Sequence, residues 1–161
     1  MALAVTHVIL TIVLIDLYRD YIARNKFPTK YVLLGGVAGL FPDIDIPLGW
    51  AYNLLTGSQA YFHGTFTHSV LIPIVLAIAS ILAYEVSGNR KLGLVLAVIS
   101  FGWLFHLILD CVFSPYMIFL PFSTIACPFE ISTELAIGLD AVILLLWLVH
   151  EEWTHKIRDY I

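Results

Sequence analysis

The chain has 161 residues, of which 60% are hydrophobic and 12% are charged, and its mean hydropathy is +0.92. Soluble globular domains carry about 25% charged residues, so this composition excludes such a domain and indicates an integral membrane protein. The formal net charge of −4 says little about partners, and we expect no nucleic acid among them. The length suits a single membrane-embedded helical domain over residues 1–161.

Apolar runs between polar clusters predict five helices, at about 2–18, 31–42, 68–86, 92–113 and 133–150. We interpret the first as a retained span, because it lacks a basic leading segment and a small-residue cleavage site. The second is too short before Pro42 to cross a hydrocarbon core that needs about 20 residues, so it begins near Pro28 or ends inside the membrane. We therefore predict an all-α, polytopic helical bundle of about five transmembrane helices, one or two of them short or broken.

Gly35 and Gly39 lie four residues apart in the second run, a spacing that lets a neighbouring helix approach closely. We expect these glycines to serve helix packing.

The basic residues indicate a topology. They occur in three places only: Arg19, Arg24, Lys26 and Lys30 after the first run, Arg90 and Lys91 after the third, and Lys156 and Arg158 after the fifth. With five spans these places share one side, which the positive-inside rule assigns to the cytoplasm. We expect an inner (plasma) membrane protein with its N-terminus outside and its C-terminus in the cytoplasm.

Histidines and aspartates gather at the other side of this map. They lie at the outer ends of the first four runs: His7, Asp43, Asp45, His63, His68, His106 and Asp110. His106 and Asp110 are one helical turn apart and share a face. Ionisable groups at membrane depth are costly and usually functional, so this grouping predicts a site.

A divalent cation is the expected counter-charge for these aspartates. No lysine or arginine occurs between Tyr31 and Asn89 or between Leu92 and His155. Mixed imidazole and carboxylate donors favour a transition metal, zinc first and manganese second, over calcium. The surplus of donors predicts one or two ions, with some residues orienting the others. The alternative is a buried hydrogen-bond network that only ties the helices together.

Four segments in order carry a resemblance to a known family: His7, then "PDID", then "HGTFTHS", then "HLILD". Over about residues 6–122 the chain resembles the YdjM family of membrane-bound proteins regarded as metal-dependent hydrolases. The resemblance implies a polytopic helical protein with a metal site at the histidines and aspartates named above. Family members often carry an arginine directly after the first histidine of the third segment, where this chain has Gly64.

Metal-dependent hydrolysis follows from such a donor set. We expect His7, Asp45, His63, His68, His106 and Asp110 as metal ligands. Asp43 is expected to be the catalytic base, on the view that an extended turn points it away from Asp45.

A site at headgroup level favours a membrane lipid or lipid-linked ester as the substrate, with a phosphoester as the leading choice. Two alternatives stay open: a non-catalytic, metal-stapled partner or regulatory protein, and a divalent-metal transporter. A homo-oligomer also stays open.

Three smaller motifs lead to further predictions. Thr65, Thr67 and Ser69 are expected to cap the third helix, and the alternative is hydrogen bonding to the ligand carboxylates. The segment "HEEWTH" at 150–155 is no zinc-peptidase motif, because its histidines are five rather than four residues apart. Cys111 and Cys127 both map outside, where a disulfide is permitted but two buried thiols are equally ordinary.

Overall fold

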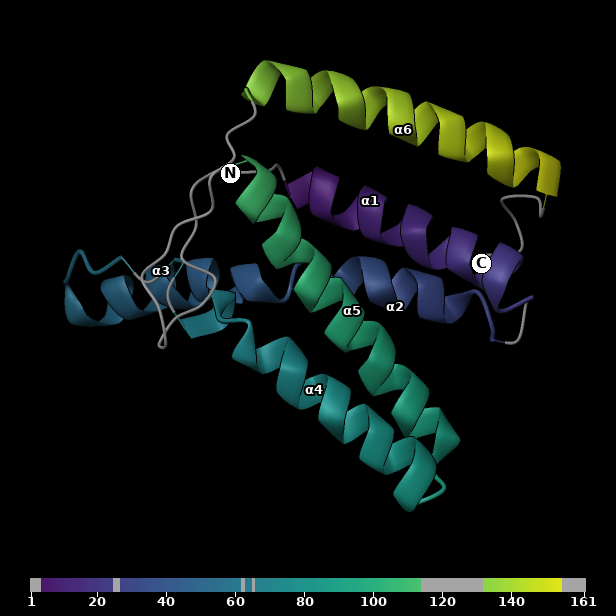
Figure 1. The fold of residues 1–161 in the computed structure, drawn as a ribbon. Helices are drawn as coiled ribbons and strands as arrows, with labels where there is room; N and C mark the ends of the chain where they lie inside the picture. Colours follow the sequence, from purple (N-terminus) through teal and green to yellow (C-terminus); the bar gives the residue numbers. More distant parts are fainter. Residues whose placement is uncertain (1–3, 25–26, 62, 65, 114–131, 155–161) are drawn as a thin grey trace.

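The computed structural model describes residues 4–24, 27–61, 63–64, 66–113 and 132–154. These residues are all helical or in short connections, and the described part contains six α-helices (Figure 1). The helices are α1 (Ala4–Leu17), α2 (Lys30–Ala38), α3 (Asp45–Thr56), α4 (Leu71–Ile81), α5 (Arg90–Phe113) and α6 (Thr133–Thr154). Short turns extend them: π-helical turns Tyr18–Ile22 and Leu82–Val86 follow α1 and α4, and 3-10 turns Pro42–Ile44 and Phe66–His68 precede α3 and α4.

All five predicted helices are present, and the expected all-α class is confirmed. The second predicted helix corresponds to α2. It begins at Lys30, close to Pro28, which was one of the two alternatives for this short helix, and it ends at Ala38.

No helix was predicted between residues 42 and 68, and an extended turn was expected to carry Asp43 and Asp45; instead Asp43 lies in the 3-10 turn Pro42–Ile44 and Asp45 begins helix α3. Pro47 lies in the first turn of α3, and a proline is tolerated there because the first N–H groups of a helix lack intrahelical acceptors. The premise that Asp43 and Asp45 alternate along an extended segment therefore fails.

Membrane-span candidates are few when judged by length and composition. Within the described residues, Arg90–Val112 alone is long and apolar enough to cross a membrane by itself. Lys30–Ala38 and Pro42–Thr56 meet the same criteria only when they are taken together as one pair bent by 50°, as in a broken span or a re-entrant loop. Leu71–Val86 is a shorter apolar helix. The count of five crossings stays a prediction.

Small residues allow the helices to pack closely. A Cβ at Gly35 would overlap the side chain of Ile15 on α1, and one at Gly102 of α5 would lie 2.7 Å from the Gly35 carbonyl oxygen. At Gly39 a Cβ would lie 3.0 Å from the His7 carbonyl oxygen. The packing role expected for Gly35 and Gly39 is thereby confirmed.

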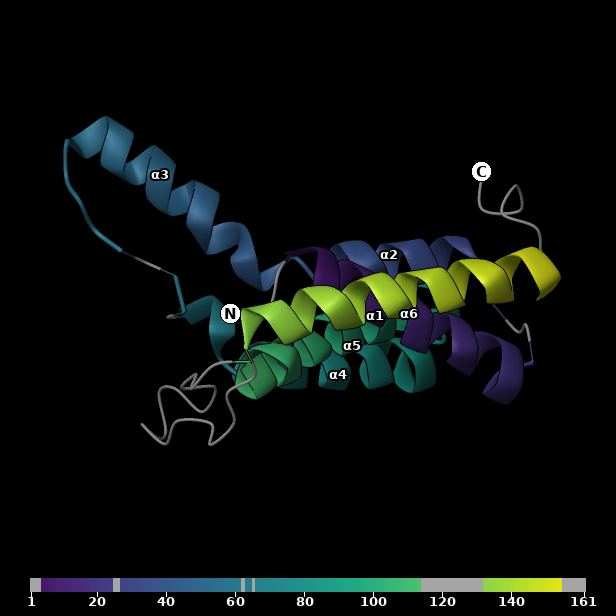
Figure 2. The same cartoon turned by 90° about the horizontal axis from the view of Figure 1, so that it is seen from above.

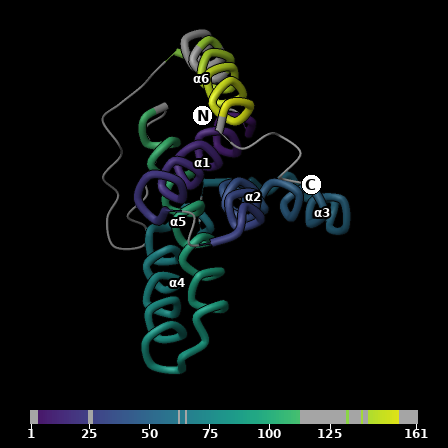
Figure 3. The backbone as a smooth tube through the Cα atoms, turned by 90° about the vertical axis from the view of Figure 1, so that its right-hand side faces the viewer, coloured from purple at the N-terminus to yellow at the C-terminus, as the bar shows by residue number. Residues whose placement is uncertain are grey.

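Helix α2 packs against both α1 and α5, α4 pairs with α5, and α6 lies along α1 (Figure 3). Helix α3 stands away from the other helices (Figure 2).

The up-and-down order of the helices positions the candidate site. Helix α1 begins, α2 ends, α4 begins and α5 ends near the same end of the bundle (Figure 1). The polar residues at those helix ends therefore meet, although they are far apart in the sequence.

Candidate metal centre

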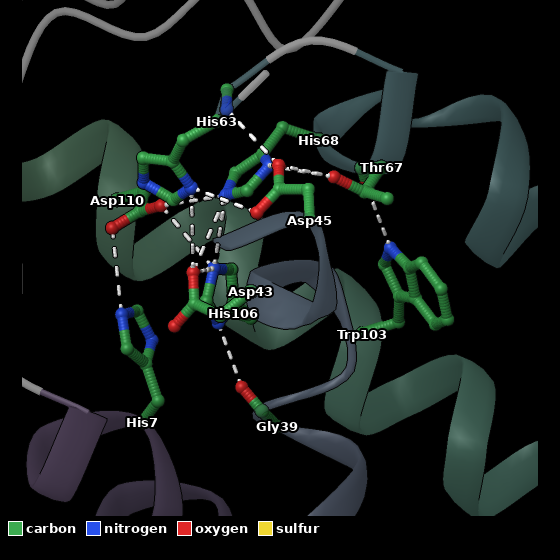
Figure 4. Close-up of polar contacts among 11 residues, drawn as sticks. His7, Gly39, Asp43, Asp45, His63, Thr67, His68, Trp103, His106 and Asp110 are labelled. Carbon is green, nitrogen blue, oxygen red and sulfur yellow. Dashed lines mark hydrogen bonds and ion pairs between the residues drawn. The ribbon is translucent and has the colours of Figure 1, made fainter. Parts of the chain in front are cut away.

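The structure brings together all the histidines and aspartates singled out from the sequence (Figure 4). His7, His68, His106 and Asp110 are at most 1% exposed, and Asp45 and His63 are 6% and 8% exposed. Asp43 is the most accessible, with 21% of its side chain exposed. Every ion pair of the three aspartates within the described residues is with a histidine, so no lysine or arginine neutralises them there.

Four donor atoms form the centre of this group. The Nε2 atom of His106 lies 3.2 Å from Asp110 Oδ2 and 3.5 Å from Asp43 Oδ1. The Nε2 atom of His68 lies 3.5 Å from Asp110 Oδ2 and 3.7 Å from Asp43 Oδ1. The two Nε2 atoms are 3.4 Å apart. A tetrahedral zinc ion with bonds of roughly 2.0–2.2 Å holds its donors about 3.3–3.6 Å apart, and these five spacings lie close to that range.

The tautomers of the two central histidines follow from their other contacts. His106 Nδ1 lies 2.7 Å from the Gly39 carbonyl oxygen, which can only accept, so this nitrogen carries the proton. Thr67 Oγ1 donates to Asp45 Oδ2 at 2.7 Å and therefore accepts from His68 Nδ1 at 3.1 Å. In the neutral rings both Nε2 atoms then present lone pairs to the centre. Two facing lone pairs beside two carboxylates repel one another unless a cation lies among them, so the residues present fit a bound metal.

Asp45 does not contribute to the four central donor atoms but contacts the outward-facing nitrogen of His68. Its Oδ1 accepts a hydrogen bond from His63 Nδ1 at 3.0 Å, and its Oδ2 lies 3.4 Å from His68 Nδ1. The backbone N–H of Gly64 donates to Oδ2 at 3.2 Å. Gly64 has φ of 77°, a left-handed conformation that strains other residues, so an arginine in its place would not fit this turn without strain. Asp45 thus orients the rings of His63 and His68 and fixes the backbone between these two residues.

His7 approaches the centre from α1. Its Nε2 lies 3.4 Å from Asp110 Oδ1, and its ring stacks on His106 with centroids 3.8 Å apart. Three triads have donor atoms within 4.8 Å of one another and are linked through His68 and His106: His7, His106 and Asp110; Asp43, His68 and His106; and Asp45, His63 and His68. The donor set can therefore hold one central ion with flanking residues, or more than one ion.

Some supporting groups were not identified from the sequence. The carbonyl oxygen of Gly39 orients His106, and Trp103 Nε1 donates to the Thr67 carbonyl oxygen at 2.9 Å. Thr67 bonds a carboxylate rather than capping a helix. Ser69 Oγ accepts from Leu71 N at 3.3 Å, but Ser69 lies one residue before the N-cap Val70, which makes no side-chain capping hydrogen bond. Thr65 lies outside the described residues. A backbone carbonyl leaves no signal in the sequence, so the Gly39 contact could not have been found there.

A cavity of about 520 Å³ lies against helix α3, and Asp45 and His63 are the site residues that line it. His63 and Asp45 form its end nearest the donors, and Gly49, Asn53 and Tyr61 line it further out. This volume is in the range of small-molecule sites.

The segment "HEEWTH" lies elsewhere. His150 Nδ1 is 3.3 Å from Glu151 Oε1, and its Nε2 is 3.2 Å from the Tyr21 hydroxyl at the far end of α1. His150 and Glu151 also form a triad with Asp16. His155 lies outside the described residues.

Cys111, directly after Asp110, is disulfide-bonded, which favours the first of the two alternatives for this residue. Cys127 lies outside the described residues.

The fold and the site together define a helical membrane protein with a buried histidine and aspartate centre suited to a metal ion. The family model described as YdjM inner membrane protein matches residues 1–158. The chain therefore belongs to this family, as its sequence motifs indicated. No curated protein and no solved structure matches it.

Proposed function

We propose that this chain is a membrane-embedded, metal-dependent hydrolase. The observation that carries the proposal is a set of four donor atoms whose neighbours in the site, Asp45 and His63, line a cavity. A centre that served only to fasten helices would need no such cavity.

Asp43, His68, His106 and Asp110 would hold the ion. Bound there, a divalent cation supplies a Lewis acid that activates water and polarises a phosphoryl or carbonyl oxygen. The Gly39 carbonyl oxygen and Asp45 keep the two imidazoles in the tautomer that binds metal. This reverses the roles expected from the sequence, because the distances favour Asp43 as a donor and Asp45 as the residue that orients.

His63 is then the best-placed proton acceptor. It lines the cavity, and its Nδ1–H bond to Asp45 leaves Nε2 as the basic nitrogen of the neutral ring. A histidine oriented by a carboxylate is a common general base.

We favour a lipid or lipid-linked phosphoester as the substrate. The chain belongs to an inner membrane protein family, and the site lies at one end of an apolar bundle, close to where lipid headgroups would lie. Basic side chains do not neutralise the described site residues, so the phosphate charge would have to be met by the ion.

One observation favours a second candidate, a metal staple without catalysis. Four protein donors would fill the coordination shell of a tetrahedral ion, and closed sites of this kind are usually structural, whereas catalytic sites keep a position open. The enzyme requires that Asp43, the most exposed donor, give way or that the ion accept a fifth ligand.

The test is metal content measured beside turnover. Purified protein should contain one or two zinc or manganese ions per chain and should cleave bis(p-nitrophenyl) phosphate or phospholipid vesicles. His63→Gln should keep its metal yet lose turnover. A metal-replete wild type that cleaves no phosphoester or other ester would leave the staple as the function.

The proposed orientation has the N-terminus outside. Tags at residues 20–26, at 88–91 and at the C-terminus should then be cytoplasmic, and labels at 55–60 and 117–124 should be accessible from outside. A single tag on the opposite side would contradict the five-span topology.

A further inference from the structure

Helix α3 is amphipathic, but its polar side faces inward and its apolar side faces outward, the reverse of a surface helix in a soluble protein. Its inner face, against the cavity, carries the polar or small residues Asp45, Gly49 and Asn53. Its outer face is apolar and highly exposed, with Leu54 and Leu55 86% and 84% exposed. Leu48 and Tyr52 of α3 are also exposed, and Trp50 is 71% exposed while also lining the cavity. A helix with its polar side inward needs an apolar medium or partner outside.

The tip of α3 satisfies its own polar groups. Asn53 Oδ1 accepts from Ala60 N at 3.0 Å and from Ser58 Oγ at 2.8 Å, and Asn53 Nδ2 donates to the Ala60 carbonyl oxygen at 2.9 Å. Gly57, with φ of 67°, ends the helix in the left-handed conformation and turns the chain back. Internal hydrogen bonding of this kind is what a lipid environment demands of a chain reversal.

Charge is absent along the same stretch. Residues 46–62 contain no aspartate, glutamate, lysine or arginine, and they include Trp50, Tyr52 and Tyr61, types that favour the membrane interface. A partner protein would usually be met by a rim of charged residues, whereas this stretch offers none.

The cavity between α3 and the returning chain leads to the site. Its lining combines aromatic rings and uncharged polar groups, namely Trp50, Asn53, Ser58, Gln59 and Tyr61, with Asp45 and His63 at the inner end. The outer lining carries no basic residue, so it suits the uncharged, hydroxyl-bearing part of a headgroup and leaves the phosphate to the metal centre.

We propose that α3 and residues 57–61 form a lipid-inserted substrate arm. The apolar outer face of the arm lies among acyl chains, and the cavity beneath it admits a phospholipid headgroup sideways from the bilayer to His63. The location of the arm stands by itself, while its role in substrate entry rests on the proposed hydrolase function.

The location can be tested in nanodiscs that hold one chain each. A fluorescent label at Leu54→Cys should emit at short wavelength and be quenched by nitroxides on lipid acyl chains. The same label at Asn89→Cys, an exposed polar position in the α4–α5 turn, should be quenched by aqueous iodide. Quenching of the Leu54→Cys label by iodide, or protection only in discs with two copies, would overturn the proposal; the second result would assign the face to a dimer.

The role of the arm in substrate entry is tested by comparing the cleavage of a lipid substrate with the cleavage of a soluble one. Leu54→Glu combined with Leu55→Glu should lower the ratio of phosphatidylglycerol cleavage in vesicles to bis(p-nitrophenyl) phosphate cleavage by about tenfold or more. Val86→Gln changes an equally exposed apolar residue outside the arm and should leave the ratio unchanged. An unchanged ratio in the double variant would overturn the entry role. If the wild type cleaves neither ester, the hydrolase proposal fails, and the labelling still decides where the arm lies.

Discussion

Two groups of buried carboxylates lie at opposite ends of helix α1, and they are neutralised differently. At the far end, Arg19 lies 3.4 Å from Asp16 Oδ1 and 3.0 Å from Asp20 Oδ1, and its Nε donates to the Phe27 carbonyl oxygen at 3.1 Å. At the near end, beside His7, three aspartates face four imidazoles.

The two ends therefore have different electrostatic requirements. Arg19 is always charged and is held in place by three acceptors, so the far cluster contains its own counter-charge and serves the fold. The near cluster has imidazoles whose central nitrogens carry lone pairs in the neutral rings, so its carboxylates are balanced only by a bound cation or by protonated histidines. Both clusters contain triads able to hold an ion, and among the described residues only the far cluster also contains an arginine paired with its aspartates.

The largest expected effect is at the near end. Asp110→Asn removes a carboxylate that contacts His7, His68 and His106, and it should lower metal affinity by about 100-fold or more, because even an outer partner typically costs 10–100-fold. His106→Ala should behave alike. Elemental analysis by mass spectrometry measures how much metal each purified variant retains. His150→Ala, in the far cluster, is the control and should keep its metal; a loss there would erase the distinction between the two ends.

At the far end the expected effect is on stability. Arg19→Met leaves the fully buried Asp16 without its guanidinium and should cost about 3–5 kcal/mol of unfolding free energy. Thermal unfolding in detergent measures this loss, and metal content should not change. Adding Asp16→Asn should recover part of the stability; failure to do so would mean that Arg19 acts through Phe27 alone.

Asp43 and Asp45, both in the near cluster, are expected to differ in their effect on zinc affinity. Asp45→Asn should weaken zinc binding by about 10–100-fold, since Asp45 orients His63 and His68, whereas Asp43→Asn should weaken it further as the loss of a donor. Competition with a chelator measures both affinities. The opposite order would restore the roles expected from the sequence.

The smallest effect concerns Gly64. Gly64→Ala forces a side chain into a left-handed conformation and should destabilise the protein by about 1 kcal/mol. Gly138→Ala, in helix α6 with open space around the added Cβ, should stabilise by a similar amount. Unfolding midpoints of the two variants compare them; equal shifts would contradict the strained turn.

The sequence predicted where the site lies better than how it is built. Helices that alternate in direction bring His7, Asp43, His68 and Asp110 to one end, so counting runs was enough to place them together. Helix α3 was missed because the chain after Pro42 was interpreted as a turn and a loop, although Pro47 lies in the first turn of the helix, where a proline is tolerated. The roles of Asp43 and Asp45 depended on that local conformation. The bond from His106 to Gly39 involves a backbone atom, which no residue type identifies.

Gly39 contributes both to helix packing and to the orientation of a metal-binding histidine. Its missing side chain lets α2 approach α1 beside His7 and Thr11, and its carbonyl oxygen holds His106 of α5. The four proposed donors come from the turn after α2, the turn before α4 and from α5, so a bound ion would fasten segments that could otherwise tilt independently in a bilayer. Helices adjust their tilt when the hydrocarbon thickness changes. Metal retention in this protein should therefore depend on bilayer thickness, and the centre would report the mechanical state of the membrane around it.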